Sequence, residues 1–170
     1  MPPRHEADIL ACIPSLRRYA RGLTGDVHRA DDLVQDTLER AWRRLSLWRR
    51  RGDLRAWAFS IMHNLYVDGL RARAGRPEDA TGEDLPELPE RPTQADALEL
   101  RDLDRALQRL APELRAVLLL VGVEDLSYRQ AAAVLGVPLG TVMSRLSRAR
   151  ERLDALLRQD AGAPRLQRVK

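Results

Sequence analysis

Residues 126–142 read Leu-Ser-Tyr-Arg-Gln-Ala-Ala-Ala-Val-Leu-Gly-Val-Pro-Leu-Gly-Thr-Val, and this stretch decides the fold of the C-terminal part of the chain. Ser127 and Gln130 stand three residues apart, which is the spacing of a capping box and predicts the start of a short helix. The two alanines after Gln130 permit close helix packing, and Gly136 suits a sharp turn into a second helix. The pattern therefore predicts a helix-turn-helix.

The second helix of this unit has two faces. Its apolar residues form one stripe, made of Val142, Leu146, Ala149, Leu153 and Leu156. Its polar residues fall on a separate face, made of Thr141, Ser144, Arg145, Arg148 and Arg152. In a helix-turn-helix the second helix enters the major groove, where arginine binds guanine or phosphate and hydroxyls bind phosphate or base. An arginine-rich face is often merely solvated, but the turn directs this helix into a groove, so we expect DNA contact.

The first block of the chain is also predicted to be helical, because its apolar residues recur at spacings of three and four and nowhere alternate as in a strand. One helix is expected through Leu10, Ile13, Leu16 and Tyr19, ending near Gly22–Gly25. A second is expected to begin at Asp31/Asp32, since acids favour a helix N-terminus. It is predicted to run through Val34, Leu38, Ala41, Trp42 and Leu45. A third follows the loop at 49–53, with Trp57, Ile61, Leu65 and Val67 as its apolar side.

The last part of the chain opens with two further predicted helices. The first runs through Leu103, Leu107 and Leu110, and the second runs from Pro112, which is tolerated in a first turn, through Leu114, Val117, Leu118 and Val121. No strand is expected anywhere, so the fold class is all-α.

Charge divides the chain into three parts. Residues 1–76 hold 15 arginines against 9 acids, residues 77–99 hold one arginine against 8 acids, and residues 100–170 hold 13 basic residues against 8 acids. The middle part also contains four prolines and almost no apolar periodicity, which is typical of a linker. We therefore expect two small helical domains, at 1–76 and 100–158, joined by an acidic proline-rich linker at 77–99 and followed by a basic tail at 159–170.

Composition favours some classes of function and excludes others. Of the 29 basic residues only Lys170 is a lysine, a bias that suits phosphate binding but that a GC-rich genome explains equally well. Cys12 is the single cysteine and the three histidines are scattered, so we expect no metal and no cofactor. Glycine-rich phosphate loops and paired nucleophiles are lacking, which argues against an enzyme. The longest apolar stretch, near Val117 to Val123, is too short for a membrane span, and we expect a cytoplasmic protein.

An acidic face interrupts the basic first block. Helical spacing turns Val34, Leu38, Ala41 and Leu45 inward, which leaves a polar set together on the outside: Asp32, Gln35, Asp36 and Glu39. Such a face is either simply solvated or a docking patch for a basic protein helix, and spacing alone favours the first interpretation.

At this point the sequence resembles a known family. Residues 31–42, Asp-Asp-Leu-Val-Gln-Asp-Thr-Leu-Glu-Arg-Ala-Trp, are similar to the region 2.2 motif of the extracytoplasmic-function (ECF) sigma factors of the sigma-70 family, and residues 126–150 are similar to their region 4 helix-turn-helix. The resemblance covers roughly residues 8–75 and 98–157. It implies a sigma factor that directs core RNA polymerase to promoters and assists promoter melting in transcription initiation.

The resemblance also implies roles for particular residues. Asp32, Gln35 and Asp36, with Glu39 beside them, would dock on the clamp helices of the polymerase beta-prime subunit, and the beta subunit would be a further partner. Residues 57–68 resemble a stretch in which Asn64 would hold a flipped base of the minus-ten element, with Trp48, Arg49, Arg50 and Arg51 lining the pocket or gripping phosphates. Trp57 and Phe59 are expected in the core. The polar face of the last helix would read the minus-thirty-five element, although Met143 replaces a basic residue that many relatives carry there.

Some alternatives remain open from the sequence. The acidic linker is either a plain tether or a mimic of nascent RNA in the polymerase. Regulation must come from another protein, and the family implies an anti-sigma factor that binds between the two domains. The rival functions are a helix-turn-helix regulator that binds DNA alone and a sigma-like decoy that binds only an anti-sigma factor.

Overall fold

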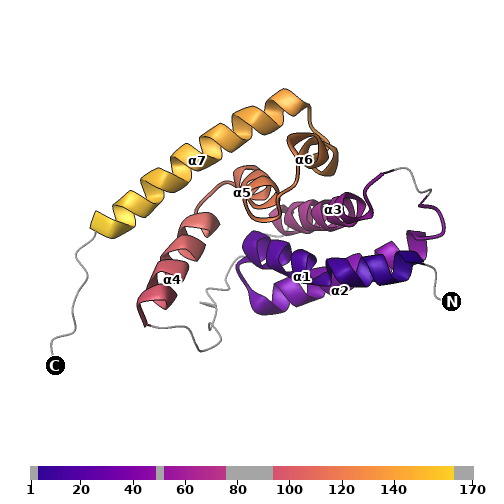
Figure 1. The fold of residues 1–170 in the computed structure, drawn as a ribbon. Coiled ribbons are helices and arrows are strands. Elements are labelled where there is room, and N and C mark those ends of the chain that lie inside the picture. Colours follow the sequence, from indigo (N-terminus) through magenta and orange to yellow (C-terminus); the bar gives the residue numbers. More distant parts are fainter. Residues whose placement is uncertain (1–3, 49–51, 76–93, 163–170) are drawn as a thin grey trace.

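The computed structural model describes residues 4–48, 52–75 and 94–162, which form helices and turns and contain no strand. The helices are α1 (Arg4–Thr24), α2 (Val27–Arg44), α3 (Leu54–Ala74), α4 (Gln94–Gln108), α5 (Pro112–Leu118), the π-helical turn η2 (Leu119–Val123), α6 (Tyr128–Leu135) and α7 (Leu139–Gly162). Figure 1 shows α1 to α3 gathered as one group and α4 to α7 as a second. The all-α prediction with two helical domains is confirmed. Among the described helices, none combines the length and apolarity that crossing a membrane requires.

Helix α2 begins at Val27, so the predicted start at Asp31/Asp32 was wrong. Gly25 has a φ of 67°, which glycine adopts without strain, and it turns the chain out of α1. Asp26 then caps α2, because its Oδ1 accepts a hydrogen bond from the backbone nitrogen of Arg29 at 2.7 Å. The start signal was therefore the Gly25–Asp26 pair, and the later acids belong to the body of the helix.

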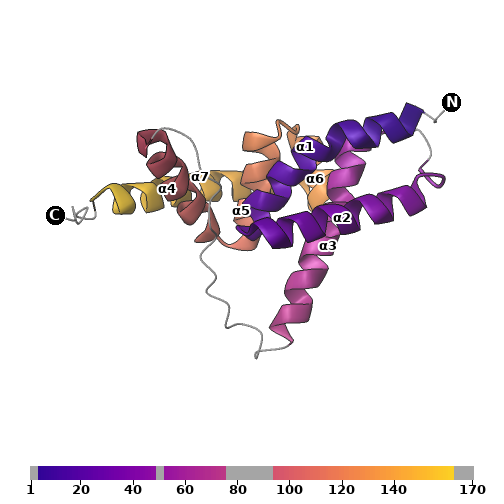
Figure 2. The ribbon, with the colours of Figure 1, turned by 90° about the horizontal axis from the view of Figure 1, so that it is seen from below.

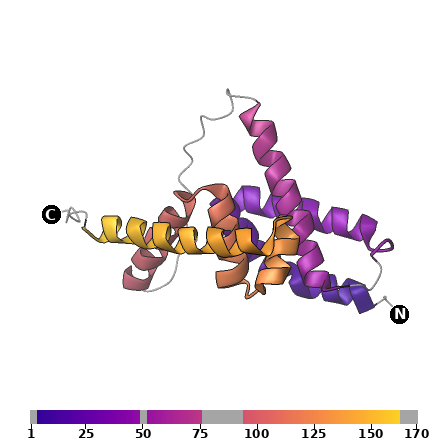
Figure 3. The same cartoon turned by 90° about the horizontal axis from the view of Figure 1, so that it is seen from above.

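Helix α3 begins after Asp53, whose Oδ1 accepts a hydrogen bond from the backbone nitrogen of Arg55 at 2.9 Å. Its buried residues are Leu54, Ala58, Phe59, Ile61 and Met62. Phe59 therefore lies in the core as expected, whereas Trp57 is only partly buried. The C-terminal half of α3 projects away from the other helices (Figures 2 and 3).

Helix α4 begins at Gln94, so residues 94–99, which we assigned to the linker, are helical. This hexapeptide, Gln-Ala-Asp-Ala-Leu-Glu, contains no proline or glycine and consists mostly of good helix formers. The predicted end of the linker at residue 99 rested on the acidic composition of residues 77–99. The helix propensity of residues 94–99 outweighs that composition. Residues 77–93 of the predicted linker lie outside the described residues, as do residues 163–170 of the tail.

The predicted helix-turn-helix is formed by α6 and α7. The Ser127 hydroxyl accepts from the backbone nitrogen of Gln130 at 3.1 Å, and Gln130 Oε1 accepts from the backbone nitrogen of Ser127 at 2.9 Å. This reciprocal pair is the capping box that the sequence predicted. Gly136 ends α6 with a φ of 64°. The predicted stripe of α7 is buried at Val142, Leu146, Ala149 and Leu156 and partly buried at Leu153.

The two groups of helices pack against each other. Helix α1 contacts α4, α5 and η2, and α3 contacts α6. One continuous core includes Leu16, Tyr19, Leu23, Phe59 and Met62 from the first group and Val117, Leu119, Leu120, Leu126 and Val134 from the second. We call this placement of the two domains the closed arrangement. Gly22 of α1 is needed for it, because a Cβ there would lie 2.7 Å from both methyl carbons of Leu119.

Candidate polymerase and DNA interfaces

The acidic side chains of α2 lie on the outer ridge of that helix. Asp32, Gln35, Asp36 and Glu39 are all exposed, whereas Ala30, Val34, Thr37 and Ala41 on the other side are buried. The structure therefore brings all four predicted docking residues together. Thr37 was not expected in the core; its hydroxyl is buried because it donates a hydrogen bond to the carbonyl of Leu33 at 2.6 Å.

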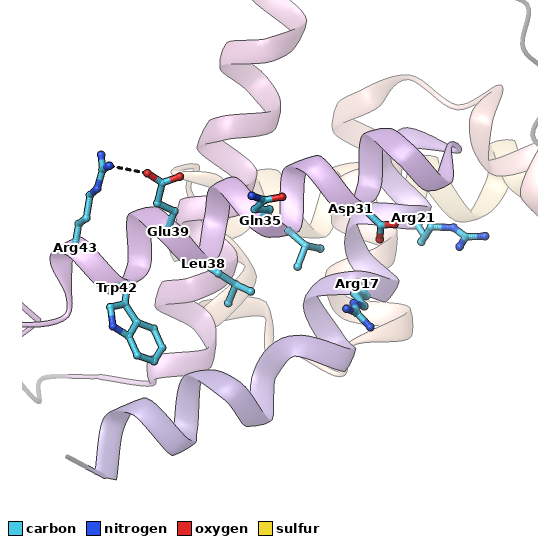
Figure 4. Close-up of a pocket in the computed structure, with 9 residues that line it drawn as sticks. Arg17, Arg21, Asp31, Gln35, Leu38, Glu39, Trp42 and Arg43 are labelled. Atoms are coloured by element: carbon cyan, nitrogen blue, oxygen red, sulfur yellow. Dashed lines mark ion pairs between the residues drawn. The ribbon is translucent and has the colours of Figure 1, made fainter. Parts of the chain in front are cut away.

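One side of this ridge forms a groove of about 950 Å³ between α1 and α2 (Figure 4). Leu38 and Trp42 supply apolar surface in the groove, Arg17 and Arg21 come from α1, and Glu39 pairs with Arg43 at 2.6 Å. Trp42, which the inward-facing set predicted from helical spacing did not include, lies on the surface. The small Ala41 occupies the buried position, and the next residue, about 100° further round the helix, reaches the groove with its side chain 46% exposed.

Asp32 and Asp36 face a second groove of about 420 Å³ on the other side of the ridge. Helix α3 contributes Leu65, Tyr66 and Arg73 to this groove, and Pro112 and Arg115 come from α5. The ridge thus separates two grooves, with Gln35 and Glu39 on one side and Asp32 and Asp36 on the other.

The described residues predicted to hold the minus-ten element lie before α3, at Trp48, and in the middle of that helix, at Asn64. Trp48 is partly buried, with its ring centroid 5.1 Å from that of His5 and 6.3 Å from that of Trp57. Arg49, Arg50 and Arg51 fall outside the described residues. Asn64 is exposed on α3, and its neighbour His63 points inward, with Nδ1 3.2 Å from the Tyr19 hydroxyl. Asn64 is therefore available to a ligand from solvent.

The polar face of α7 is mostly exposed. Ser144, Arg148 and Arg152 are exposed, whereas Thr141 and Arg145 are partly buried. The pKa of His63 is lowered to about 4, first by burial and then by the positive charge of Arg145. In the closed arrangement the charge of the predicted minus-thirty-five reader therefore acts on His63 of α3, the helix that carries Asn64.

A buried ion cluster joins the two domains, and sequence reasoning missed it. Glu124 follows η2, and its side chain is fully buried. Arg18 of α1 donates through Nε to Oε1 and through Nη2 to Oε2 of Glu124, both at 3.1 Å. Arg55 of α3 donates through Nη2 to Oε2 at 3.0 Å and to the Glu124 carbonyl at 2.8 Å. The sequence contains one sign that Glu124 is buried: it directly follows the longest apolar stretch, near Val117 to Val123.

Arg115 of α5 is a second buried charge at the domain boundary, with 7% of its surface exposed. Its guanidinium donates to the carbonyls of Leu23, Leu107, Gln108 and Leu110, all at 2.8–2.9 Å, and lies 3.5 Å from the Tyr66 hydroxyl. Burial lowers the pKa of Arg115, which the nearby Tyr66 and Asp104 partly offset. Carbonyls at helix C-termini carry partial negative charge, so they stabilise the guanidinium in this position.

The N-terminal caps of α3 and α6 are also linked. Gln130 of the capping box donates through Nε2 to Asp53 Oδ2 at 2.7 Å, while Asp53 Oδ1 caps α3. The carboxylate of Asp53 thus accepts one hydrogen bond from the first turn of α3 in its own domain and one from Gln130 in the other domain. Within the described residues there is no cluster of three or more His, Cys, Asp or Glu side chains that could hold a metal ion.

Comparisons with known proteins assign the family. Residues 9–63 match the family described as the Sigma2 domain of PhyR, and residues 100–153 match Sigma-70, region 4. The ECF RNA polymerase sigma factor EcfG of Rhodopseudomonas palustris (strain TIE-1) is 43% identical over 153 residues, which cover 90% of this chain and 84% of EcfG. The chain belongs to the ECF sigma factors. The family resemblance of the two sequence motifs is therefore confirmed, and this sigma factor acts in transcription initiation by directing core RNA polymerase to promoters.

Two solved structures share the placement of the domains. The sigma factor RpoE of Bartonella quintana, in complex with the anti-sigma factor NepR, is 36% identical and superposes with a TM-score of 0.78 over 91% of this sigma factor and 97% of RpoE. CnrH, in complex with the cytosolic domain of CnrY, is 29% identical and gives a TM-score of 0.70 over 92% of this chain and 88% of CnrH. Because both superpositions include the two domains, the closed arrangement resembles that of sigma factors solved in such complexes.

Proposed function

We propose that this ECF sigma factor uses three separate surfaces for its work with polymerase. The ridge of α2, with Asp32, Gln35, Asp36 and Glu39, docks on the clamp helices of the beta-prime subunit. Asn64, with Trp48 and the arginines at 49–51, holds the minus-ten element. The polar face of α7 reads the minus-thirty-five element through Thr141, Ser144, Arg145, Arg148 and Arg152. The observation that carries this assignment is the exposure of the acidic ridge on one domain and of Arg148 and Arg152 on the other.

The groove beside the ridge supports the docking role. Its apolar surface, from Leu38 and Trp42, lies between cationic and anionic side chains. That combination suits an amphipathic helix of a partner protein, which buries an apolar face and pairs charges at its edges. A merely solvated face, the interpretation that spacing favoured, does not account for a tryptophan that is 46% exposed.

The closed arrangement must open when promoter DNA is bound. The minus-ten and minus-thirty-five elements lie roughly 25 base pairs apart, which is about 85 Å at 3.4 Å per base pair. In the closed arrangement, however, the charge of Arg145 acts on His63, the residue next to Asn64. The two readers cannot reach both elements from that position, so the DNA-bound state has separated domains.

We further propose that an anti-sigma factor binds this chain in the closed arrangement. The support is the resemblance to RpoE solved with NepR and to CnrH solved with CnrY. A partner that binds only the closed arrangement shifts the population away from the open, DNA-binding state. This sigma factor would meet both partners in the cytoplasm, where core polymerase works. The acidic linker then acts either as a tether or as a mimic of nascent RNA.

The test is binding and transcription with purified components. The full chain is titrated onto promoter DNA with and without core polymerase, and the promoter is selected by the holoenzyme from a genomic library. We expect specific binding and transcription only when core polymerase is present. Specific duplex binding by the chain alone would instead indicate a stand-alone regulator, and failure to bind core polymerase would indicate a decoy.

A further inference from the structure

The ion cluster at Glu124 has more positive than negative charge. One carboxylate accepts three hydrogen bonds from two guanidinium groups, and both Arg18 and Arg55 reach the same oxygen, Oε2, at 3.0–3.1 Å. The two arginines come from α1 and α3 of the first domain (α1 to α3, called region 2), whereas the carboxylate comes from the second domain (α4 to α7, called region 4). Arg18 donates two parallel bonds, through Nε and Nη2, which is the fork geometry with which arginine recognises carboxylate and phosphate alike.

Opening the domains removes the carboxylate but leaves both arginines on region 2. Their guanidinium groups then lie close together without an anion between them, and like charges at such short range repel each other. The side chains are 55% and 33% exposed even in the closed arrangement, so departure of region 4 opens the pair to solvent. The open state of region 2 therefore has a vacant site for an anion with at least two oxygens.

The position of the pair indicates which anion takes this site. Arg55 lies in the first turn of α3, two residues after the cap Asp53, and the same helix carries Asn64. A DNA strand that reaches α3 presents the phosphates of its backbone, and each phosphate is an oxygen-rich anion.

We propose that Arg18 and Arg55 form a phosphate-binding pair for the promoter strand at the minus-ten element, and that Glu124 occupies this pair in the closed arrangement as an intramolecular substitute for phosphate. The inference rests on the proposed function, since it requires a DNA-bound state with separated domains. Glu124 and DNA compete for the same two guanidinium groups. The closed arrangement thus keeps a phosphate site on region 2 occupied.

The test compares Glu124→Gln, Arg18→Gln and Arg55→Gln in two states of the protein. In the free full-length chain, each of the three variants loses the ion cluster, so each should increase the radius of gyration measured by small-angle X-ray scattering. In holoenzyme, where Glu124 has already left the pair, only the arginine variants should weaken binding to a promoter fragment. Each should lower the slope of log affinity against log salt by about 0.7 to 0.9, the loss of one phosphate contact.

Two matched variants control for charge and for folding. Arg158→Gln removes an exposed arginine of α7 that pairs only locally with Asp154 at 2.8 Å, and Glu113→Gln removes an exposed acid of α5. Circular dichroism and core-polymerase binding identify variants that fail to fold, and Arg18→Lys, which retains the charge, should recover most of the salt slope. The proposal is overturned if the Arg18 and Arg55 variants bind promoter in holoenzyme as the Arg158 control does, or if Glu124→Gln weakens binding as much as they do. Failure of the wild-type holoenzyme to bind promoter at all would instead count against the proposed function.

Discussion

Arg145 of the recognition helix lies close enough to His63 of α3 for its positive charge to contribute to the lowered pKa of His63. The larger cause is burial of the imidazole, which also has the Tyr19 hydroxyl 3.2 Å from Nδ1. Protonation of this buried imidazole would therefore place a second positive charge within the field of a cation from the other domain.

The first prediction concerns the pH dependence of stability. The pKa of His63 falls from 6.5 to about 4 on folding, so between these values the unfolded chain binds the extra proton. The free energy of unfolding should therefore decrease as the pH falls from about 6.5 towards 4, with no further loss from this group below that range. The contribution of His63 to this loss is at most about 3 kcal/mol at 1.36 kcal/mol per pKa unit.

Urea unfolding of the wild type and His63→Gln at several pH values between about 7 and 5 measures this contribution. The variant should lose less stability over that interval, because it lacks the titrating group. His28→Gln removes an exposed histidine of α2 and should behave as the wild type does. Parallel pH profiles for the wild type and His63→Gln would show that burial of His63 does not couple to folding.

The second prediction tests the acidic ridge. Replacing Asp32 and Asp36 together by Lys should abolish binding to core polymerase, because it reverses the charge that the clamp helices are proposed to meet. Helicity should be unchanged, since both side chains are exposed. Pull-down with purified core polymerase measures the binding. A control with lysine at the exposed Asp8 and Asp154 makes the same change of charge away from the ridge, and equal binding by both double variants would leave α2 with a merely solvated face.

Local patterns made much of this fold predictable. The capping box of Ser127 and Gln130, the turn at Gly136 and the stripe of α7 each depend on residues a few positions apart, and the structure has all three. The ridge of α2 followed from helical spacing in the same way. The start of α2 was misplaced because several acids follow its true cap, Asp26, and spacing alone does not say which of them accepts the backbone hydrogen bond.

The contacts between the domains could not be predicted in this way. Glu124 meets Arg18 across 106 positions of sequence and Arg55 across 69, and Arg115 reaches Leu23 across 92. Charged side chains are usually exposed to solvent. The residues close to Glu124 and Arg115 in the sequence therefore do not by themselves predict that these two side chains are buried. Their burial becomes intelligible only when the partners from the other domain are in place, since an unpaired charge in that position would be strongly destabilising.

The third prediction concerns promoter melting. Asn64→Ala should impair formation of the open complex more than initial promoter binding, because a flipped base is captured only after the duplex opens. Permanganate footprinting at matched promoter occupancy reports the unpaired thymines directly. Ser147→Ala removes an exposed polar side chain of α7 that lies outside the proposed reading face, and it should melt the promoter as the wild type does. Equal melting by Asn64→Ala and the wild type would remove Asn64 from the minus-ten site.

The last prediction separates two arginines of the recognition helix. Arg145 lies nearer the N-terminal end of α7, which meets the base edges in a helix-turn-helix. Arg145→Ala should therefore cost roughly 1–3 kcal/mol of binding and relax the preference at one position of the minus-thirty-five element. Arg148 lies almost one turn further on and is fully available to a phosphate, since it is exposed. Arg148→Ala should weaken all promoters about equally and lower the salt slope by about one ion.

Both variants are titrated as holoenzyme on a small library of minus-thirty-five variants at several salt concentrations. Holoenzyme is essential here, because in the free chain Arg145 is partly buried and its removal also changes the charge that acts on His63. The outcome that reverses the assignment is a changed sequence preference in Arg148→Ala with an unchanged one in Arg145→Ala. If neither variant alters binding at any salt concentration, the polar face of α7 is not the reading face, and the helix-turn-helix must approach DNA in another orientation.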